Sequence, residues 1–116
     1  MTPSTNAPLD LPMPLDVRRA DSFFSRLGGL LILAPLQAGQ GLLLAPCSSV
    51  HTAFMRYAID VVFLDRAGVI KKIVPSLKPW RAVACAGAYQ TLELAAGQAA
   101  RLQLVPGTRI SLHGSD

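Results

Sequence analysis

Two apolar runs separated by a short turn place the strongest constraint on the fold of this chain. Residues 58–64 include Val61, Val62 and Phe63, which are β-branched or aromatic, and the run has no helical period. The turn Asp-Arg-Ala-Gly follows at residues 65–68, and its last residue, Gly68, is free to adopt a positive φ. Residues 69–74 are again apolar in the main. The sequence therefore predicts an antiparallel β-hairpin over residues 58–74.

Shorter signals of the same kind extend along the rest of the chain. Alternating or apolar runs predict further strands over the residues 15–18, 41–46, 89–94 and 108–112. A short helix is expected to begin at Asp21 or Ser22 and to end near the Gly pair at residues 28–29, and an Ala-rich stretch at residues 95–104 favours one or two helical turns. The apolar run 30–36 is ambiguous between helix and buried strand, and Pro75 and Pro79 are expected to bracket a loop.

Many short strands and few helical pieces indicate the fold class. We expect an α+β domain that is mainly β, namely a small barrel-like, antiparallel-rich body with one or two short helices. The chain has 116 residues, the length of one domain, and shows no internal repeat or linker. Residues 1–13 are Pro-rich and predict a flexible lead-in, which leaves residues 14–113 as a single globular domain.

Composition limits the classes of function. The composition, with 51% hydrophobic and only 16% charged residues, predicts a folded domain. Some of its surface is expected to be apolar and available to a partner, and a homodimer is one possibility. The net charge is +4, but the Lys and Arg residues are scattered, which disfavours nucleic-acid binding. The N-terminus lacks a basic signal-peptide region, and the most apolar run, 27–36, is far shorter than the roughly 20 residues that cross a bilayer. The sequence therefore predicts no membrane contact and a cytoplasmic location.

The Cys and His residues are the candidates for metal binding and for nucleophilic catalysis. A tetrahedral zinc site needs four ligands, and the chain has four Cys and His residues, namely Cys47, His51, Cys85 and His113. Only Cys47 and His51 are close in sequence, so we expect no metal. Cys47 with His51, or His51 with Asp60, suggests a hydrolase mechanism, although no signature of a known nucleophile surrounds Cys47. Buried thiols are the simpler interpretation.

Polar residues inside the apolar strands are the other candidates. Asp60 interrupts the run 58–64, where an unpaired carboxylate would be costly to bury, so it must have a partner. A side chain of His51, Thr52 or Arg56 or a backbone N–H would serve, and the two interpretations are a structural hydrogen bond and a pocket wall, with the structural one favoured. The alternation of residues 89–94 predicts that Glu93 lies on the polar face of its strand, as a structural residue.

An aromatic side chain between cations is the last candidate. Trp80 lies in a predicted loop with Lys78 and Arg81, where the ring could stack on a ligand or close the end of a barrel. Together these residues outline a candidate binding cleft made of His51, Arg56, Asp60, Lys78 and Trp80.

Two long motifs carry a resemblance to a known family. The stretches SVHTAFMRYAIDVVFLDRAGVI and LKPWRAVACAGAYQTLELAAGQAARL resemble the family named "domain of unknown function 192", a group of uncharacterised bacterial and archaeal proteins. The resemblance covers about residues 22–112 and implies a small β-barrel-like body with short helices and no established activity. One departure is Ala58, where the family usually has Pro before Ile-Asp.

These observations leave three hypotheses of function. We favour a non-enzymatic module that binds an unidentified small molecule or protein at the cleft, without a cofactor. The alternatives are a hydrolase that uses His51 with Asp60 or Cys47, and a weak nucleic-acid binder.

Overall fold

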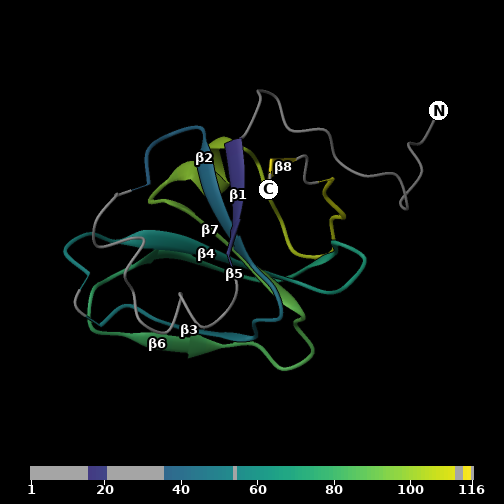
Figure 1. Ribbon diagram of the computed structural model, residues 1–116, viewed down its shortest axis with the longest axis horizontal. Coiled ribbons are helices and arrows are strands. Elements are labelled where there is room, and N and C mark those ends of the chain that lie inside the picture. Colours follow the sequence, from purple (N-terminus) through teal and green to yellow (C-terminus); the bar gives the residue numbers. More distant parts are fainter. Residues whose placement is uncertain (1–15, 21–35, 54, 112–113, 116) are drawn as a thin grey trace.

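A computed structural model of the chain describes residues 16–20, 36–53, 55–111 and 114–115 (Figure 1). Within these residues the chain is mostly β, with one short helix. The strands and the helix, in chain order, are β1 (Asp16–Ala20), β2 (Gln40–Leu44), β3 (Ser49–His51), β4 (Ile59–Leu64), β5 (Ile70–Leu77), β6 (Ala82–Ala84), β7 (Gln90–Ala95), α3 (Gln98–Arg101) and β8 (Gly114–Ser115).

The strands form two sheets. The larger sheet has six strands in the order β5-β4-β7-β2-β1-β8, and the smaller sheet pairs β3 with β6. The β4–β5, β4–β7, β2–β7 and β3–β6 pairs are antiparallel, whereas β1 is parallel to both β2 and β8. In Figure 1 the β3–β6 pair lies below the six-stranded sheet and forms a second layer. The prediction of a mainly β, antiparallel-rich domain is confirmed.

The predicted hairpin is present as β4 and β5. The Asp65 carboxylate accepts the backbone N–H groups of Ala67 and Val69, both at 2.9 Å, and so holds the turn. Gly68 has a φ of +88°, and a Cβ at this position would lie 2.8 Å from the carbonyl oxygen of Ile110. The turn therefore needs Gly for two reasons, its backbone conformation and the close approach of residue 110.

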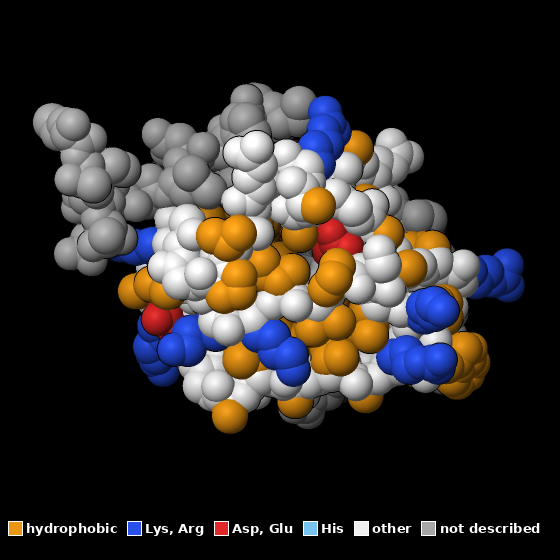
Figure 2. Space-filling view, turned by 180° about the vertical axis from the view of Figure 1, so that it is seen from behind, with side chains coloured by type: hydrophobic (Ala, Val, Ile, Leu, Met, Phe, Trp, Pro, Cys, Tyr) orange, Lys and Arg blue, Asp and Glu red, His pale blue; other side chains and the backbone are white. Residues whose placement is uncertain are grey.

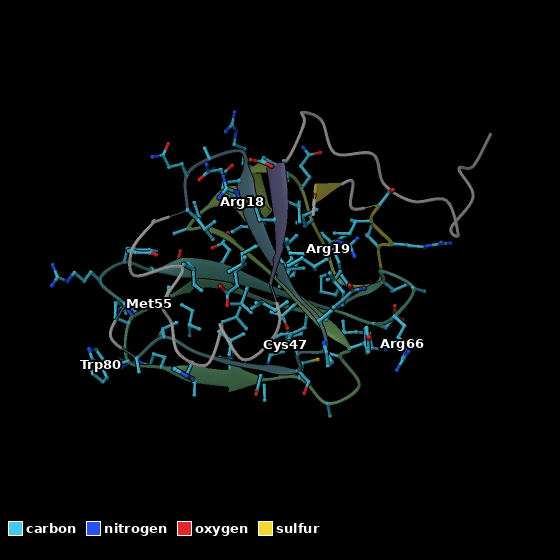
Figure 3. All side chains as sticks on the ribbon, viewed as in Figure 1. Arg18, Arg19, Cys47, Met55, Arg66 and Trp80 are labelled. Carbon is cyan, nitrogen blue, oxygen red and sulfur yellow. The ribbon has the colours of Figure 1, made fainter. Side chains whose placement is uncertain are left out.

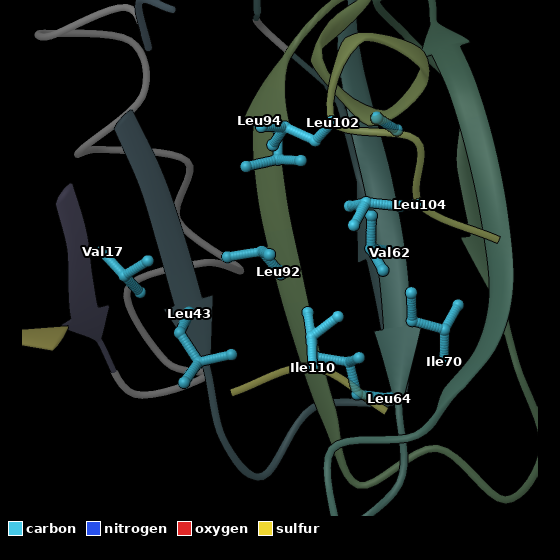
Figure 4. Packing of buried hydrophobic residues seen from close by; sticks show 11 residues of the cluster. Val17, Leu43, Val62, Leu64, Ile70, Leu92, Leu94, Leu102, Leu104 and Ile110 are labelled. Carbon is cyan, nitrogen blue, oxygen red and sulfur yellow. The ribbon is translucent and has the colours of Figure 1, made fainter. Parts of the chain in front are cut away.

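The central strands β4, β7 and β2 of the six-stranded sheet are buried on both faces, each face by its own apolar cluster. The helix-side cluster, which includes Ala99 of α3, is shown in part in Figure 4; its buried members are Val17, Leu43, Val62, Leu64, Ile70, Leu92, Leu94, Ala99, Leu102, Leu104 and Ile110. The small-sheet cluster lies on the other face; its buried members are Leu42, Leu44, Cys47, Val50, Met55, Ile59, Val61, Phe63 and Leu77. Because β4 is covered on both sides, its sequence is apolar on both faces instead of alternating, with Asp60 as the one polar residue.

Most of the shorter elements follow the sequence prediction. The strands over 15–18, 41–46 and 89–94 and the helical turns within 95–104 correspond to β1, β2, β7 and α3. The expected helix at 21–28 and the run 30–36 lie outside the described residues, as does the lead-in 1–13. A single domain over 14–113 stays a prediction.

Three expectations need correction. No strand forms over the described residues 108–111, where Arg109 makes one bridge to Val69, and the chain pairs with β1 only at β8. The loop expected after Pro75 begins later, because β5 continues to Leu77; as an edge strand it tolerates a residue that lacks an N–H. The third correction concerns the barrel. Among the described strands, β5 and β8 end the sheet and do not pair with each other, so a closed barrel is not observed.

Candidate functional site

A buried threonine organises the loop that carries Trp80. Thr52 has no solvent exposure and follows β3 directly. Its hydroxyl donates to the carbonyl oxygen of Lys78 at 2.6 Å and accepts the backbone N–H of Arg81 at 2.9 Å. Its own N–H donates to the carbonyl of Arg81 at 2.8 Å, and its carbonyl accepts the N–H of Trp80 at 3.0 Å. Four hydrogen bonds from one residue thus fix the path of residues 78–81.

The same loop holds Trp80 outward in a strained conformation. Its φ is +63°, in the left-handed region that side chains other than Gly rarely adopt, and 61% of its surface is exposed. Lys78 and Arg81 on either side are exposed, and the Arg81 guanidinium donates to the Trp80 carbonyl at 3.3 Å. Figure 3 shows Trp80 projecting from one end of the molecule, the end at which Met55 also lies.

The other predicted cleft residues divide between this end and the protein interior. His51 ends β3, is partly buried, and pairs in register with Ala82, next to Arg81. Arg56 is exposed and follows Met55, whose backbone N–H donates to the Thr52 carbonyl at 3.1 Å. The hydrogen bonds of Thr52 therefore connect the segments that carry His51, Arg56, Lys78 and Trp80.

Asp60 does not join them. Its side chain is fully buried on the helix side of β4, where one carboxylate oxygen accepts the N–H of Ser76 and the other the N–H of Ala99, both at 2.8 Å. Between Ile59 and Val61 the register of β4 against β5 shifts, and the Asp60 carboxylate takes the N–H that this bulge frees. Asp60 therefore ties α3 and the β5 bulge to the centre of the sheet, which agrees with its structural interpretation.

The described geometry supports neither form of the hydrolase hypothesis. Both carboxylate oxygens of Asp60 are engaged by backbone groups on the face away from the small sheet. The buried Cys47 thiol donates to the Ser49 carbonyl at 3.1 Å. Among the described residues, no group of three or more His, Cys, Asp and Glu side chains is placed to hold a metal ion.

Glu93 is the residue that sequence reasoning placed incorrectly. Its neighbours Leu92 and Leu94 point to the helix-side cluster, so Glu93 points to the small-sheet cluster, where it pairs in register with Leu42 and Val61. It is 1% exposed, and its Oε2 atom has no hydrogen-bond partner. A buried polar atom without a partner costs about 1–3 kcal/mol.

The environment of Glu93 changes its ionisation. Burial raises the pKa of its carboxyl to about 8. Burial also raises the pKa of Tyr57, and the charge of Glu93 adds to that effect. The sequence does contain a signal for the burial of Glu93, because this residue lies between two apolar residues of a strand, as Asp60 does in β4. The alternation of Thr91 and Glu93 with leucines instead indicated a solvent-facing side of the strand. In this position Glu93 is a candidate functional residue.

Comparison with known proteins identifies the family. The family model DUF192, described as "Uncharacterized ACR", matches residues 6–112. The chain belongs to the DUF192 family. The resemblance seen in the sequence motifs is thereby confirmed, and this family membership carries no activity with it.

Two solved structures share the fold of this DUF192 chain. One is a protein of unknown function from Novosphingobium aromaticivorans, with a TM-score of 0.72 and 20% identity over 84% of this chain and 75% of that one. The other is described as a putative transcription regulator from Sinorhizobium meliloti, with a TM-score of 0.72 and 24% identity over 82% of this chain and 79% of that one. At these identities the likeness shows the fold alone.

The remaining comparisons add two findings. No curated protein matches this DUF192 chain. Within the part of the chain that the structure describes, there is no helix with the length and apolar character needed to cross a membrane.

Proposed function

We propose that the protein is a non-enzymatic binding module whose contact surface is formed by Arg56, Lys78, Trp80 and Arg81, here called the Trp80 surface. The observation that carries this proposal is the outward, left-handed conformation of Trp80. A body of two packed sheets, barrel-like in outline, would serve as the rigid support for the loop.

The conformation of Trp80 is unfavourable for stability alone. A left-handed backbone costs an L-residue roughly 1–2 kcal/mol, and Gly would avoid that cost. An exposed indole also contributes little burial to the core. The buried Thr52 hydrogen bonds offset the strain and hold the ring in place. Strain of this kind clusters at ligand-binding sites, where it pre-organises a contact.

The surroundings of Trp80 indicate the chemistry of the ligand. Lys78 and Arg81 flank the ring, Arg56 is exposed on the segment that Thr52 connects to it, and no acidic side chain belongs to this set. The chain as a whole carries a net charge of +4, and Figure 2, which views the molecule from behind, shows Lys and Arg side chains spread along the lower part of the surface. A planar anionic group would stack on the indole while the cations neutralise its charge.

The proposal can be tested through the indole itself. Trp80 is the only Trp in the chain, so its side-chain N–H gives one NMR signal that reports on this surface. Benzoate is expected to shift the signal in a saturable way, whereas benzylamine and benzyl alcohol are expected not to. Equal shifts from all three compounds, or none from benzoate, would contradict the proposal.

Charge variants supply the matched control. Lys78→Ala and Arg81→Ala are expected to weaken the benzoate response, and Lys71→Ala to leave it unchanged. Lys71 is also exposed but lies at the other end of β5, about 20 Å along the strand. If Lys71→Ala weakened the benzoate response as much as Lys78→Ala does, the response would reflect nonspecific charge attraction and would contradict the proposal.

Single-stranded nucleic acid is a second candidate ligand for the Trp80 surface. An exposed aromatic ring between cations is the arrangement on which unpaired bases stack, and one structural neighbour is described as a putative transcription regulator. Oligonucleotide binding should then weaken steeply with salt, and Arg81→Ala should reduce the slope of log affinity against log salt by about 1. Absence of binding at low salt would dismiss this candidate.

A further inference from the structure

Among the described strands, β6 forms a free edge of the small sheet, because its one strand neighbour is β3. Just beyond the end of β6, the N–H of Cys85 donates to the carbonyl of Ser48 at 3.0 Å. Bonded and unbonded pairs alternate along an antiparallel ladder, and the positions before Cys85 continue the register of β3 with β6. The backbone groups of Ala84 and Ala82 therefore point away from β3, along the outer edge of β6.

Little of the chain shields this edge. Ala82 and Ala84 are exposed, and their side chains are small. The ammonium group of Lys72, which reaches over from β5, donates to the carbonyl of Ala84 at 3.1 Å. Within the described part of the chain, the N–H and C=O of Ala82 and the N–H of Ala84 have no hydrogen-bond partner. Backbone groups in such a row are a template for pairing with another extended chain.

The charge around the edge has a single sign. The sequence from the start of β5 to the end of β6, residues 70–84, contains no Asp or Glu. Lys72 lies beside Ala84, Arg81 comes directly before Ala82, and Lys78 lies on the loop that leads to β6. In Figure 1 β6 lies at the lower boundary of the molecule, and Figure 2 shows Lys and Arg side chains at that height. The edge is thus complementary in charge to an acidic chain.

We propose that the outer edge of β6 binds an extended acidic peptide of a partner protein, which adds a third strand to the small sheet. This inference rests on the proposed function, because an acidic residue of the peptide supplies the anion for the Trp80 surface. Main-chain hydrogen bonds hold a strand added in this way, and the cations select for its charge. A peptide fits the edge better than single-stranded nucleic acid does, since the phosphate backbone has no N–H donor for the free carbonyl of Ala82.

Amide hydrogen exchange followed by NMR reports on this edge directly. The N–H groups of Ala82 and Ala84 are expected to exchange rapidly in the free protein, because no group protects them. The blocked peptide acetyl-DVTVTD-amide is expected to slow both by at least about tenfold at millimolar concentration, whereas acetyl-KVTVTK-amide is expected to have no effect. No slowing by the acidic peptide, or equal slowing by both, would overturn the proposal. Protection that rises with protein concentration alone would also overturn it, since a second copy then covers β6.

Proline at the edge provides a matched pair of variants. Ala84→Pro removes an outward N–H at a kind of position where edge strands tolerate proline, and it is expected to abolish the protection of Ala82 by the acidic peptide. Ala84→Val keeps the N–H and is expected to retain that protection. Unchanged backbone signals of Val62 and Leu92, in the large sheet, show that the variants are folded, and Ala82→Pro repeats the test if Ala84→Pro unfolds. Undiminished protection in a folded proline variant would overturn the proposal.

The edge and the Trp80 surface can fail separately. If benzoate shifts the Trp80 signal but the acidic peptide protects neither Ala82 nor Ala84, the edge proposal is overturned and the Trp80 surface stands. If the acidic peptide alone protects these amides and benzoate leaves Trp80 unchanged, β6 is supported as the peptide site and the Trp80 surface is overturned.

Discussion

Replacing Glu93 with glutamine is expected to remove most of the pH dependence of stability between about pH 5 and pH 8. In the folded protein burial raises the pKa of this carboxyl from 4.5 to about 8. The folded state therefore binds the proton more tightly than the unfolded chain. The stability that protonated Glu93 provides is fully present below about pH 4.5 and is lost as the pH rises towards about 8.

The magnitude follows from the difference between the two pKa values. Each pKa unit corresponds to 1.36 kcal/mol, so a shift from 4.5 to about 8 amounts to roughly 5 kcal/mol across the whole range. Between about pH 5 and pH 8, the expected loss in the free energy of unfolding is roughly 3–4 kcal/mol. Because small domains have total stabilities of about 5–15 kcal/mol, a change of this size is readily measured.

Urea denaturation of wild type and Glu93→Gln at several pH values is the assay. Wild type should lose stability relative to Glu93→Gln as the pH rises, whereas Asp16→Asn, which alters an exposed carboxylate, should follow the wild-type curve. The comparison cancels the contributions of the other titrating groups. If the difference between wild type and Glu93→Gln is the same at about pH 5 and about pH 8, the carboxyl is not buried as described and the argument fails.

Three further predictions concern the fold around the sites. Thr52→Val should cost about 1–3 kcal/mol of unfolding free energy and change the Trp80 loop, whereas Thr52→Ser, which keeps the hydroxyl, should cost less; chemical denaturation and the indole NMR signal measure both. Asp60→Ala should destabilise by about 2–5 kcal/mol because two buried N–H groups lose their acceptor, and a thermal unfolding midpoint within a degree of wild type would refute this. Gly68→Ala should destabilise more than Gly87→Ala, since both have φ near +88° but only the first brings a Cβ to 2.8 Å from a backbone carbonyl; equal losses in calorimetry would contradict it.

Local patterns predicted the elements that depend on local interactions. The hairpin of β4 and β5 was predictable because a turn with Gly68 separates two apolar runs, and the carboxylate of Asp65 closes the turn within five residues. The strand β2 and the turns at α3 were predictable for similar reasons. The pairing of β8 with β1 was not, because it joins residues almost a hundred positions apart and lies beyond the last apolar alternation.

The candidate site was predicted only in part, since a strand's sequence does not say what covers each face. Asp60 was assigned to a cleft because it interrupts an apolar strand, but the β5 bulge and α3 supply it with two backbone donors. Glu93 was assigned to a polar face because it alternates with leucines, but the second sheet buries that face. Both outcomes depend on which layer packs against the strand.

By itself, the sequence determined that the chain forms a mainly β domain of the DUF192 family with a central hairpin, because these properties are set by residue periodicity, turn chemistry and motif order. Only the tertiary structure decided the roles of individual polar residues. It holds Trp80 exposed and left-handed in a loop that is fixed by Thr52, the residue after β3, and it buries the carboxyl of Glu93 against the small-sheet cluster. These arrangements arise from contacts between distant segments, and burial and hydrogen bonding exist only once those segments meet.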